Sequence, residues 1–153
     1  MPSINWSDPE PIDDRQVDLT EPPDWRALQM SDSDIRVIEA ELRLFVPPFL
    51  REWFIENPFR DLATQHRALV CDRDRIIHGN VELRREGFYG RDWPERLLWV
   101  GDDWGGGAYF VDVAESSPAV YWYDWEEGKG DVVLAANSER RSPEEFLQFV
   151  KQT

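Results

Sequence analysis

The sequence is poor in the residue types from which many catalytic and metal sites are built. Its 153 residues include one cysteine, Cys71, and two histidines, His66 and His78. A single cysteine excludes an intramolecular disulfide. The spacing of these three residues fits no usual structural zinc pattern. A Cys–His nucleophilic pair remains an alternative, but an ordinary buried thiol explains Cys71 more simply. We therefore predict no catalytic residue, no bound metal and no cofactor.

Basic residues and long apolar runs are also scarce. The chain has 17 Lys and Arg against 31 Asp and Glu, and its formal net charge is −14. This balance argues against nucleic acid, whose phosphates attract positive charge, and against docking on anionic lipid. No apolar run approaches the roughly 18 residues of a membrane span, and the N-terminus has no apolar signal segment. We therefore expect a cytoplasmic protein that is steered toward basic partners.

The N-terminal stretch differs from the rest of the chain. Residues 1–34 carry nine acidic residues, two arginines and five of the eleven prolines. Such a composition favours an extended arm over packed structure. We predict an acidic, proline-rich arm over residues 1–30 and a single domain over residues 31–153.

Helix signals occur at both ends of the predicted domain. Ser31 and Ser33 are candidate N-caps for a helix with its apolar face at positions 35, 38 and 42. A second helix is expected to start at Pro47 or Pro48 and to close at 57–58. A third is expected after the capping sequence at 142–145. Between them, we predict a charged turn at 72–75 and short strands at 76–77 and 81–83.

Strand signals dominate the second half. Runs rich in aromatic and β-branched residues occupy 97–100, 108–113 and 119–125, and a further candidate lies at 132–135. Short turn-forming segments separate the first three runs, which is typical of an antiparallel meander. The predicted class is α+β: an antiparallel or mixed sheet meander packed against N-terminal helices and a C-terminal helix.

The segment 101–107 joins the first two strand candidates and contains four glycines, whose freedom at positive φ suits a sharp turn. The predicted structural loop glycines are Gly101, Gly105, Gly106 and Gly107. A phosphate-binding loop is disfavoured because no helix and no Lys-Ser/Thr pair follow. The aspartates at 102, 103, 112 and 124 are candidate ligands for a hard cation, but no calcium-loop pattern is present. Paired carboxylates of glycosidase type remain a weaker alternative.

A protein-binding surface is the stronger interpretation of this acidic loop. Loops at the ends of strands commonly carry recognition residues, and tryptophan is enriched at binding hot spots. Carboxylates around an aromatic anchor would suit a basic protein surface. The candidate partner-binding residues are Asp102, Asp103, Trp104, Asp124, Trp125, Glu126 and Glu127.

Four segments resemble the SUKH superfamily of Smi–Knr type proteins, in the family's order. They are 46–57 (VPPFLREWFIEN), 98–113 (LWVGDDWGGGAYFVDV), 118–126 (PAVYWYDWE) and 142–147 (SPEEFL). The chain departs from the family's usual residues at Val46, Trp125 and Pro143.

The resemblance implies a cytoplasmic, non-catalytic α+β domain of the bacterial immunity protein kind. Such a protein neutralises a cognate toxin by stoichiometric binding. The acidity of this chain favours a basic, nuclease-type toxin as partner. The alternative is a regulatory interaction module of the same fold that is not linked to a toxin. We expect a monomer or a weak dimer.

Overall fold

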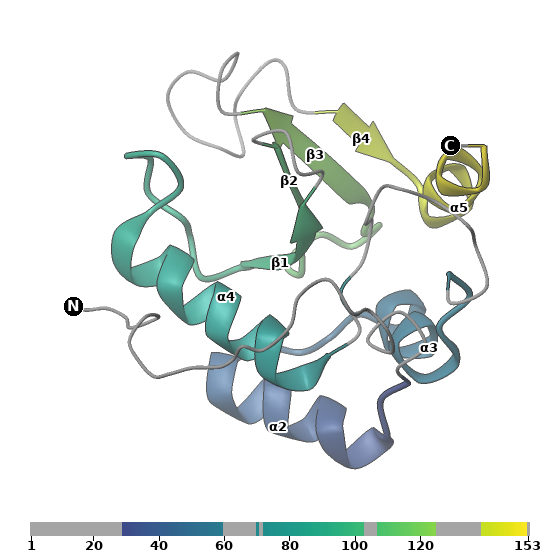
Figure 1. Cartoon of the computed structure of the whole chain (residues 1–153), viewed down its shortest axis with the longest axis horizontal. Helices are drawn as coiled ribbons and strands as arrows, with labels where there is room; N and C mark the ends of the chain where they lie inside the picture. The colour runs from purple at the N-terminus through teal and green to yellow at the C-terminus, as the bar shows by residue number, and fades with distance from the viewer. Residues whose placement is uncertain (1–28, 60–69, 71, 103–106, 125–138, 153) are drawn as a thin grey trace, which may run out of the picture.

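The computed structural model describes residues 29–59, 70, 72–102, 107–124 and 139–152. Along this part of the chain the elements are α2 (Asp32–Leu42), α3 (Pro48–Glu56), α4 (Arg73–Glu86), β1 (Leu97–Asp102), β2 (Gly107–Asp112), β3 (Val120–Asp124), β4 (Glu139–Arg141) and α5 (Pro143–Lys151). The strands form an antiparallel sheet in the order β1-β2-β3-β4. The α+β prediction is therefore confirmed (Figure 1).

The first two described helices begin and end where the local sequence signals indicate. Ser31 caps α2 through a capping box with Asp34, and α3 begins at Pro48 and is closed by Asn57 in a left-handed conformation. The segment before α2 is attached to α3, because Met30 N–H donates to the Phe54 carbonyl at 2.8 Å. The apolar faces of both helices are buried, through Ile35, Ile38, Leu42, Leu50, Trp53 and Phe54.

Helix α4 corrects the sequence-based interpretation. The predicted strands at 76–77 and 81–83 and the predicted turn at 72–75 are wrong, because these residues form one helix and its cap. The Asp72 side chain accepts a hydrogen bond from Asp74 N–H at 3.0 Å, so the charged stretch starts the helix. Ile76 and Asn80 are both fully buried, four residues apart on one helix face. This burial outweighs the β-propensity of isoleucine and valine.

The sheet includes a strand that was not predicted from the sequence. The strand that pairs with β3 is β4, directly before α5, with Tyr121 opposite Arg140. The predicted strand at 132–135 lies outside the described residues. In β1, Trp99 pairs with Phe110 and Gly101 pairs with Tyr109, so the residue between them forms a β-bulge.

One face of the sheet, which we call the first face, packs against helices. Its strand residues are Leu98, Val100, Tyr109, Val111 and Val120, and they join one buried core with residues of α2, α3, α4 and α5. Phe146 of α5 lies at the centre of the aromatic contacts of this core. Its ring centroid is 5.3 Å from that of Tyr109 and 6.0 Å from that of Trp53.

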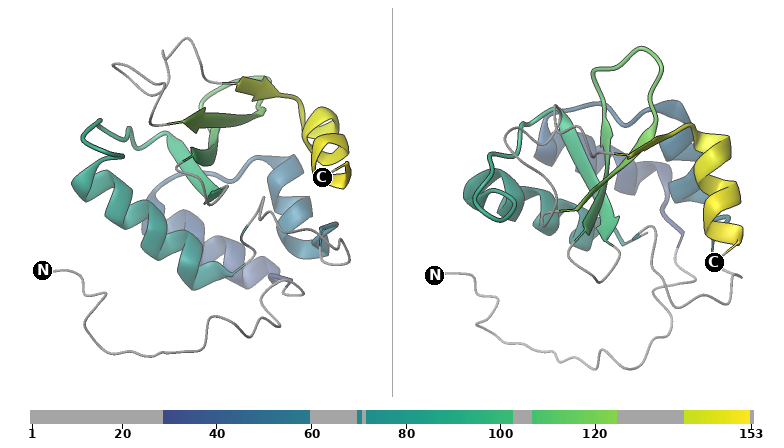
Figure 2. Two further views of the ribbon diagram at one scale, coloured as in Figure 1. Left: turned by 45° about the horizontal axis from the view of Figure 1, so that its top comes forward. Right: turned by 90° about the horizontal axis from the view of Figure 1, so that it is seen from above.

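The opposite, second face carries a smaller core made of Trp93, Leu97, Ala108, Phe110 and Tyr123. Its cover is the connection between α4 and β1 rather than a helix bundle. Trp93 packs edge-on against Phe110 at 5.4 Å, and its indole N–H donates to the Leu97 carbonyl at 3.1 Å. Figure 2 shows α4 and α5 on opposite sides of the sheet.

Helix α4 also closes the outer edge of β1. The Asn80 side chain accepts from Trp99 N–H at 2.7 Å and donates to the Trp99 carbonyl at 3.0 Å. The amide thus takes the place of a neighbouring strand and satisfies backbone groups that an edge would leave unpaired. The close approach requires Gly79, since a Cβ there would lie 2.6 Å from the Trp99 ring.

Candidate functional site

The β1–β2 connection supplies the first part of the candidate site. Gly101 lies in β1 beside the bulge, Gly107 is the first residue of β2, and both are buried. The prediction that these two glycines belong to the loop is therefore wrong, because both are paired strand residues. Asp103, Trp104, Gly105 and Gly106 lie outside the described residues.

Asp102 and Asp124 occur at the same end of the sheet. They are the last residues of β1 and β3, which flank β2 and run parallel to each other. Asp102 pairs with Ala108, and Asp124 pairs with the neighbouring Gly107. Two strand spacings separate β1 from β3, about 10 Å. The Asp102 side chain is exposed, so at least one predicted partner-binding carboxylate faces solvent at this end.

The remaining candidates of the acidic surface belong to the segment after β3. Trp125, Glu126 and Glu127 follow β3 directly and lie outside the described residues. The predicted surface is therefore represented by Asp102 and by the backbone position of Asp124.

Asp112 is not part of this group. It ends β2 at the opposite end of the sheet, about 17 Å along the strand from Gly107. Its carboxylate is buried and accepts from Arg96 Nε at 3.2 Å and from Ala114 N–H at 3.0 Å. Asp112 is therefore too far from Asp102 and Asp124 to bind the same cation, which corrects its place among the four candidate ligands, and the fourth candidate, Asp103, lies outside the described residues.

The histidines and cysteine provide no assembled site in the described ranges. His78 is exposed on α4, whereas His66 and Cys71 lie outside those ranges. Within residues that the structure describes, no three His, Cys, Asp or Glu side chains are grouped so that they could hold a metal ion.

A polar network lies on the second face beside β4. The Tyr121 hydroxyl donates to Glu115 Oε2 at 2.6 Å and accepts from Arg140 Nε at 3.2 Å. Arg140 also donates to the Ser117 carbonyl at 2.7 Å. Burial raises the pKa of the Tyr121 hydroxyl, and the hydrogen bond to Glu115 raises it further. Tyr121 is therefore a protonated donor at neutral pH, and its contacts fix the loop before β3 to β4.

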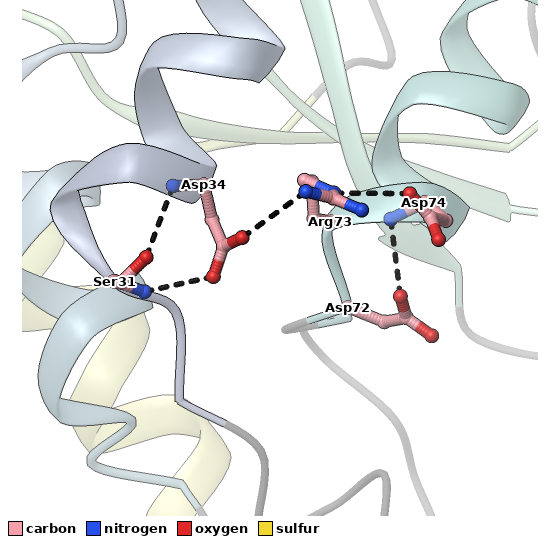
Figure 3. Close-up of polar contacts among 5 residues, drawn as sticks. All are labelled: Ser31, Asp34, Asp72, Arg73 and Asp74. Carbon is pink, nitrogen blue, oxygen red and sulfur yellow. Dashed lines mark hydrogen bonds and ion pairs between the residues drawn. The ribbon is translucent and has the colours of Figure 1, made fainter.

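A second polar network joins the N-termini of α2 and α4 (Figure 3). Asp34 accepts from Ser31 N–H at 2.9 Å and from Arg73 Nη1 at 3.3 Å. Arg73 Nε in turn donates to Asp74 at 3.0 Å. The backbone hydrogen bond from Ser31 is the largest cause that lowers the pKa of the Asp34 carboxyl, and Arg73 lowers it further. Each carboxylate drawn here caps a helix or pairs with Arg73, so the network is structural.

The sequence patterns did not indicate that the connection between α4 and β1 belongs to the candidate site. Phe88 packs edge-on against Tyr123 at 5.8 Å, and the Arg91 guanidinium carbon lies 5.9 Å from the Tyr123 ring centroid. Tyr123 precedes Asp124, so this connection reaches the end of the sheet that carries the acidic residues. The available sequence signal was the pair Gly87 and Gly90, which marks a turn between helix and strand.

Comparison with models of known protein families gives no match, and a search among curated proteins gives none either. Each helix in the described part of the chain is too short or too polar to cross a membrane.

Proposed function

We propose that this chain is a non-catalytic immunity protein that neutralises a cognate bacterial toxin by stoichiometric binding in the cytoplasm. The observation that carries the proposal is the shared position of Asp102 and Asp124 at one end of a rigid sheet. Two loops leave the sheet at this end, and loops on a rigid scaffold are favoured positions for recognition. The sequence resemblance to the SUKH superfamily adds further support.

The charge of the chain defines the kind of partner. A net charge of −14 speeds encounter with a basic protein, and a nuclease-type toxin that binds phosphates is basic for its own function. Complementary charge sets the association rate, whereas close packing at the centre of the interface sets the lifetime of the complex.

The proposal is tested by capture followed by a growth assay. The tagged full chain is expressed in its native cell, and each captured protein is then produced in a host with and without the chain. We expect a basic partner that arrests growth alone and is harmless in the presence of the chain. A captured partner that never impairs growth would contradict immunity and would favour the regulatory module.

The position of the surface is tested separately with charge reversal. Asp102→Lys should weaken binding of the purified partner at least tenfold, mainly through slower association. The matched control is Glu41→Lys, which makes the same charge change at an exposed position of α2. Equal affinities of the two variants would remove the end of the sheet from the interface without removing the immunity function.

A further inference from the structure

The connection between α4 and β1 contains a tight two-residue turn. Phe88 N–H donates to the Arg91 carbonyl at 2.8 Å, and Arg91 N–H donates to the Phe88 carbonyl at 3.0 Å. The two residues between them, Tyr89 and Gly90, both have positive φ, 50° and 85°. Two reciprocal hydrogen bonds with positive φ at both central residues define a turn of type I′.

Tyr89 is an unfavourable residue for its position in this turn. The first central position of a type I′ turn favours Asn, Asp or Gly, because a side chain with a bulky Cβ substituent is strained at positive φ. Burial does not offset this strain, since 58% of Tyr89 is exposed. Residues held in such conformations are concentrated at functional sites.

The turn that carries Tyr89 is firmly held. Phe88 packs against Tyr89 at 4.8 Å, against Trp93 at 5.9 Å and against Tyr123 at 5.8 Å. At Gly87 a Cβ would lie 2.6 Å from the Arg91 carbonyl oxygen, so the backbone is closely packed there too. An exposed tyrosine on a fixed turn loses little conformational freedom when a partner binds, which favours affinity.

Tyr89 also lies near the acidic end of the sheet. Its neighbour Phe88 contacts Tyr123 of β3. Tyr123 pairs with Ala108 of β2, and Ala108 pairs on its other side with Asp102 of β1. Two ring contacts and two strand spacings therefore connect Tyr89 to Asp102, a path of roughly 20 Å. One protein interface of about 800 Å² per partner spans this distance.

We infer that Tyr89 is an aromatic anchor of the partner-binding surface and that it binds a basic protein together with Asp102. This inference rests on the proposed function and names a residue outside the acidic loops. A tyrosine ring attracts Lys and Arg side chains through its π-face, and tyrosine is enriched at binding hot spots. Exposed Asp92, three residues further along, adds a carboxylate for the same basic partner.

Tyr89→Asn tests the inference because asparagine suits the turn while the aromatic ring is lost. We expect the melting temperature of the full chain to stay equal or to rise, since the strain at positive φ is relieved. We expect the Kd for the purified partner captured in the growth-assay experiment to rise at least tenfold. The control is Phe45→Asn, which removes an 83% exposed aromatic side chain from the connection between α2 and α3 and should leave the Kd unchanged.

The possible failures are distinguishable. If the wild-type chain binds a toxin and Tyr89→Asn binds equally well, the inference is wrong and the immunity function stands. If Tyr89→Asn lowers the melting temperature by several degrees, Tyr89 serves the fold and the inference is overturned by a measurement that needs no partner. If the wild-type chain binds no toxin, both the function and the anchor are overturned.

Discussion

The two faces of the sheet are closed in different ways. The first face is covered by α2, α3 and α5 and shares one large core with them. The second face is covered by the connection between α4 and β1, and Tyr121 and Arg140 remain partly or largely exposed on it. The helices stabilise the fold mainly through the first face, and the connection on the second face packs through Phe88 and Trp93 while leaving Tyr89 exposed. The candidate surface with Asp102 and Tyr89 lies on this second side.

The largest expected effect comes from breaking the first face. Phe146→Ala removes a fully buried ring that contacts Trp53, Phe59, Tyr109 and Phe149, and it should lower the free energy of unfolding by about 4 kcal/mol. Phe110→Ala on the second face should cost about 1 kcal/mol less, because water can reach its partly exposed neighbour Tyr121. Urea denaturation of both variants measures the difference. Equal losses would show that the two faces contribute alike.

The next largest loss of stability is expected at the outer edge of β1, which α4 covers. Asn80→Ala leaves the N–H and carbonyl of Trp99 without their side-chain partner, which should cost about 3 kcal/mol. Val81→Ala, the adjacent and partly exposed position on the same helix, is the control and should change stability by less than about 0.5 kcal/mol. Hydrogen exchange at Trp99 N–H should accelerate in Asn80→Ala. Unchanged exchange would mean that α4 does not protect this edge.

A smaller effect is expected at the polar network of the second face. Tyr121→Phe removes the hydroxyl that joins Glu115 and Arg140, so it should lower the free energy of unfolding by about 1 kcal/mol. Arg140→Ala and the double variant complete a thermodynamic cycle. Additive losses would show that the hydroxyl and the guanidinium do not act together.

The smallest effect is the pH dependence of the network between α2 and α4. The pKa of Asp34 is lower in the folded chain than in the unfolded chain, so the carboxylate adds stability above about pH 4. This contribution is lost as the pH falls through the lowered pKa. For a partly exposed group it should stay below about 1 kcal/mol. Asp34→Asn should therefore be less stable than the wild type at pH 7, and the difference should shrink at pH 3. A difference that is constant with pH would exclude the carboxylate as its cause.

The helix ends were predictable because their determinants are local. The N-cap at Ser31, the capping box at Ser142 and the proline at position 48 each act within one turn, and the structure confirms them. The strands of the β1–β2–β3 meander were predictable from their aromatic and β-branched runs. The register of these strands also places Asp102 and Asp124 at one end of the sheet, where the two predicted acidic loops begin.

Features that depend on distant contacts were not predictable. Strand β4 consists of Glu139, Arg140 and Arg141, and no apolar alternation marks it, so its pairing with β3 is a tertiary effect. In α4, isoleucine and valine favour strand locally, but the burial of Asn80 against β1 requires a helix. Tyr89 carried no signal either, because its strain and exposure become visible only with the backbone dihedral angles.

The β-bulge in β1 determines the side of the sheet to which Asp102 points. Val100 has no partner in β2, and beyond it Asp102 pairs with Ala108 of the second face. If all six residues of β1 paired regularly, without the bulge, Asp102 would be opposite Gly107 and would point toward the apolar first face, because one residue of slippage reverses every side chain. Deletion of Val100 would remove the bulge and leave Asp102 opposite Ala108, whereas regular pairing of all six residues would turn this carboxylate toward the helices. The direction of the acidic group at this end of the sheet therefore depends on whether β1 accommodates Val100 in a bulge.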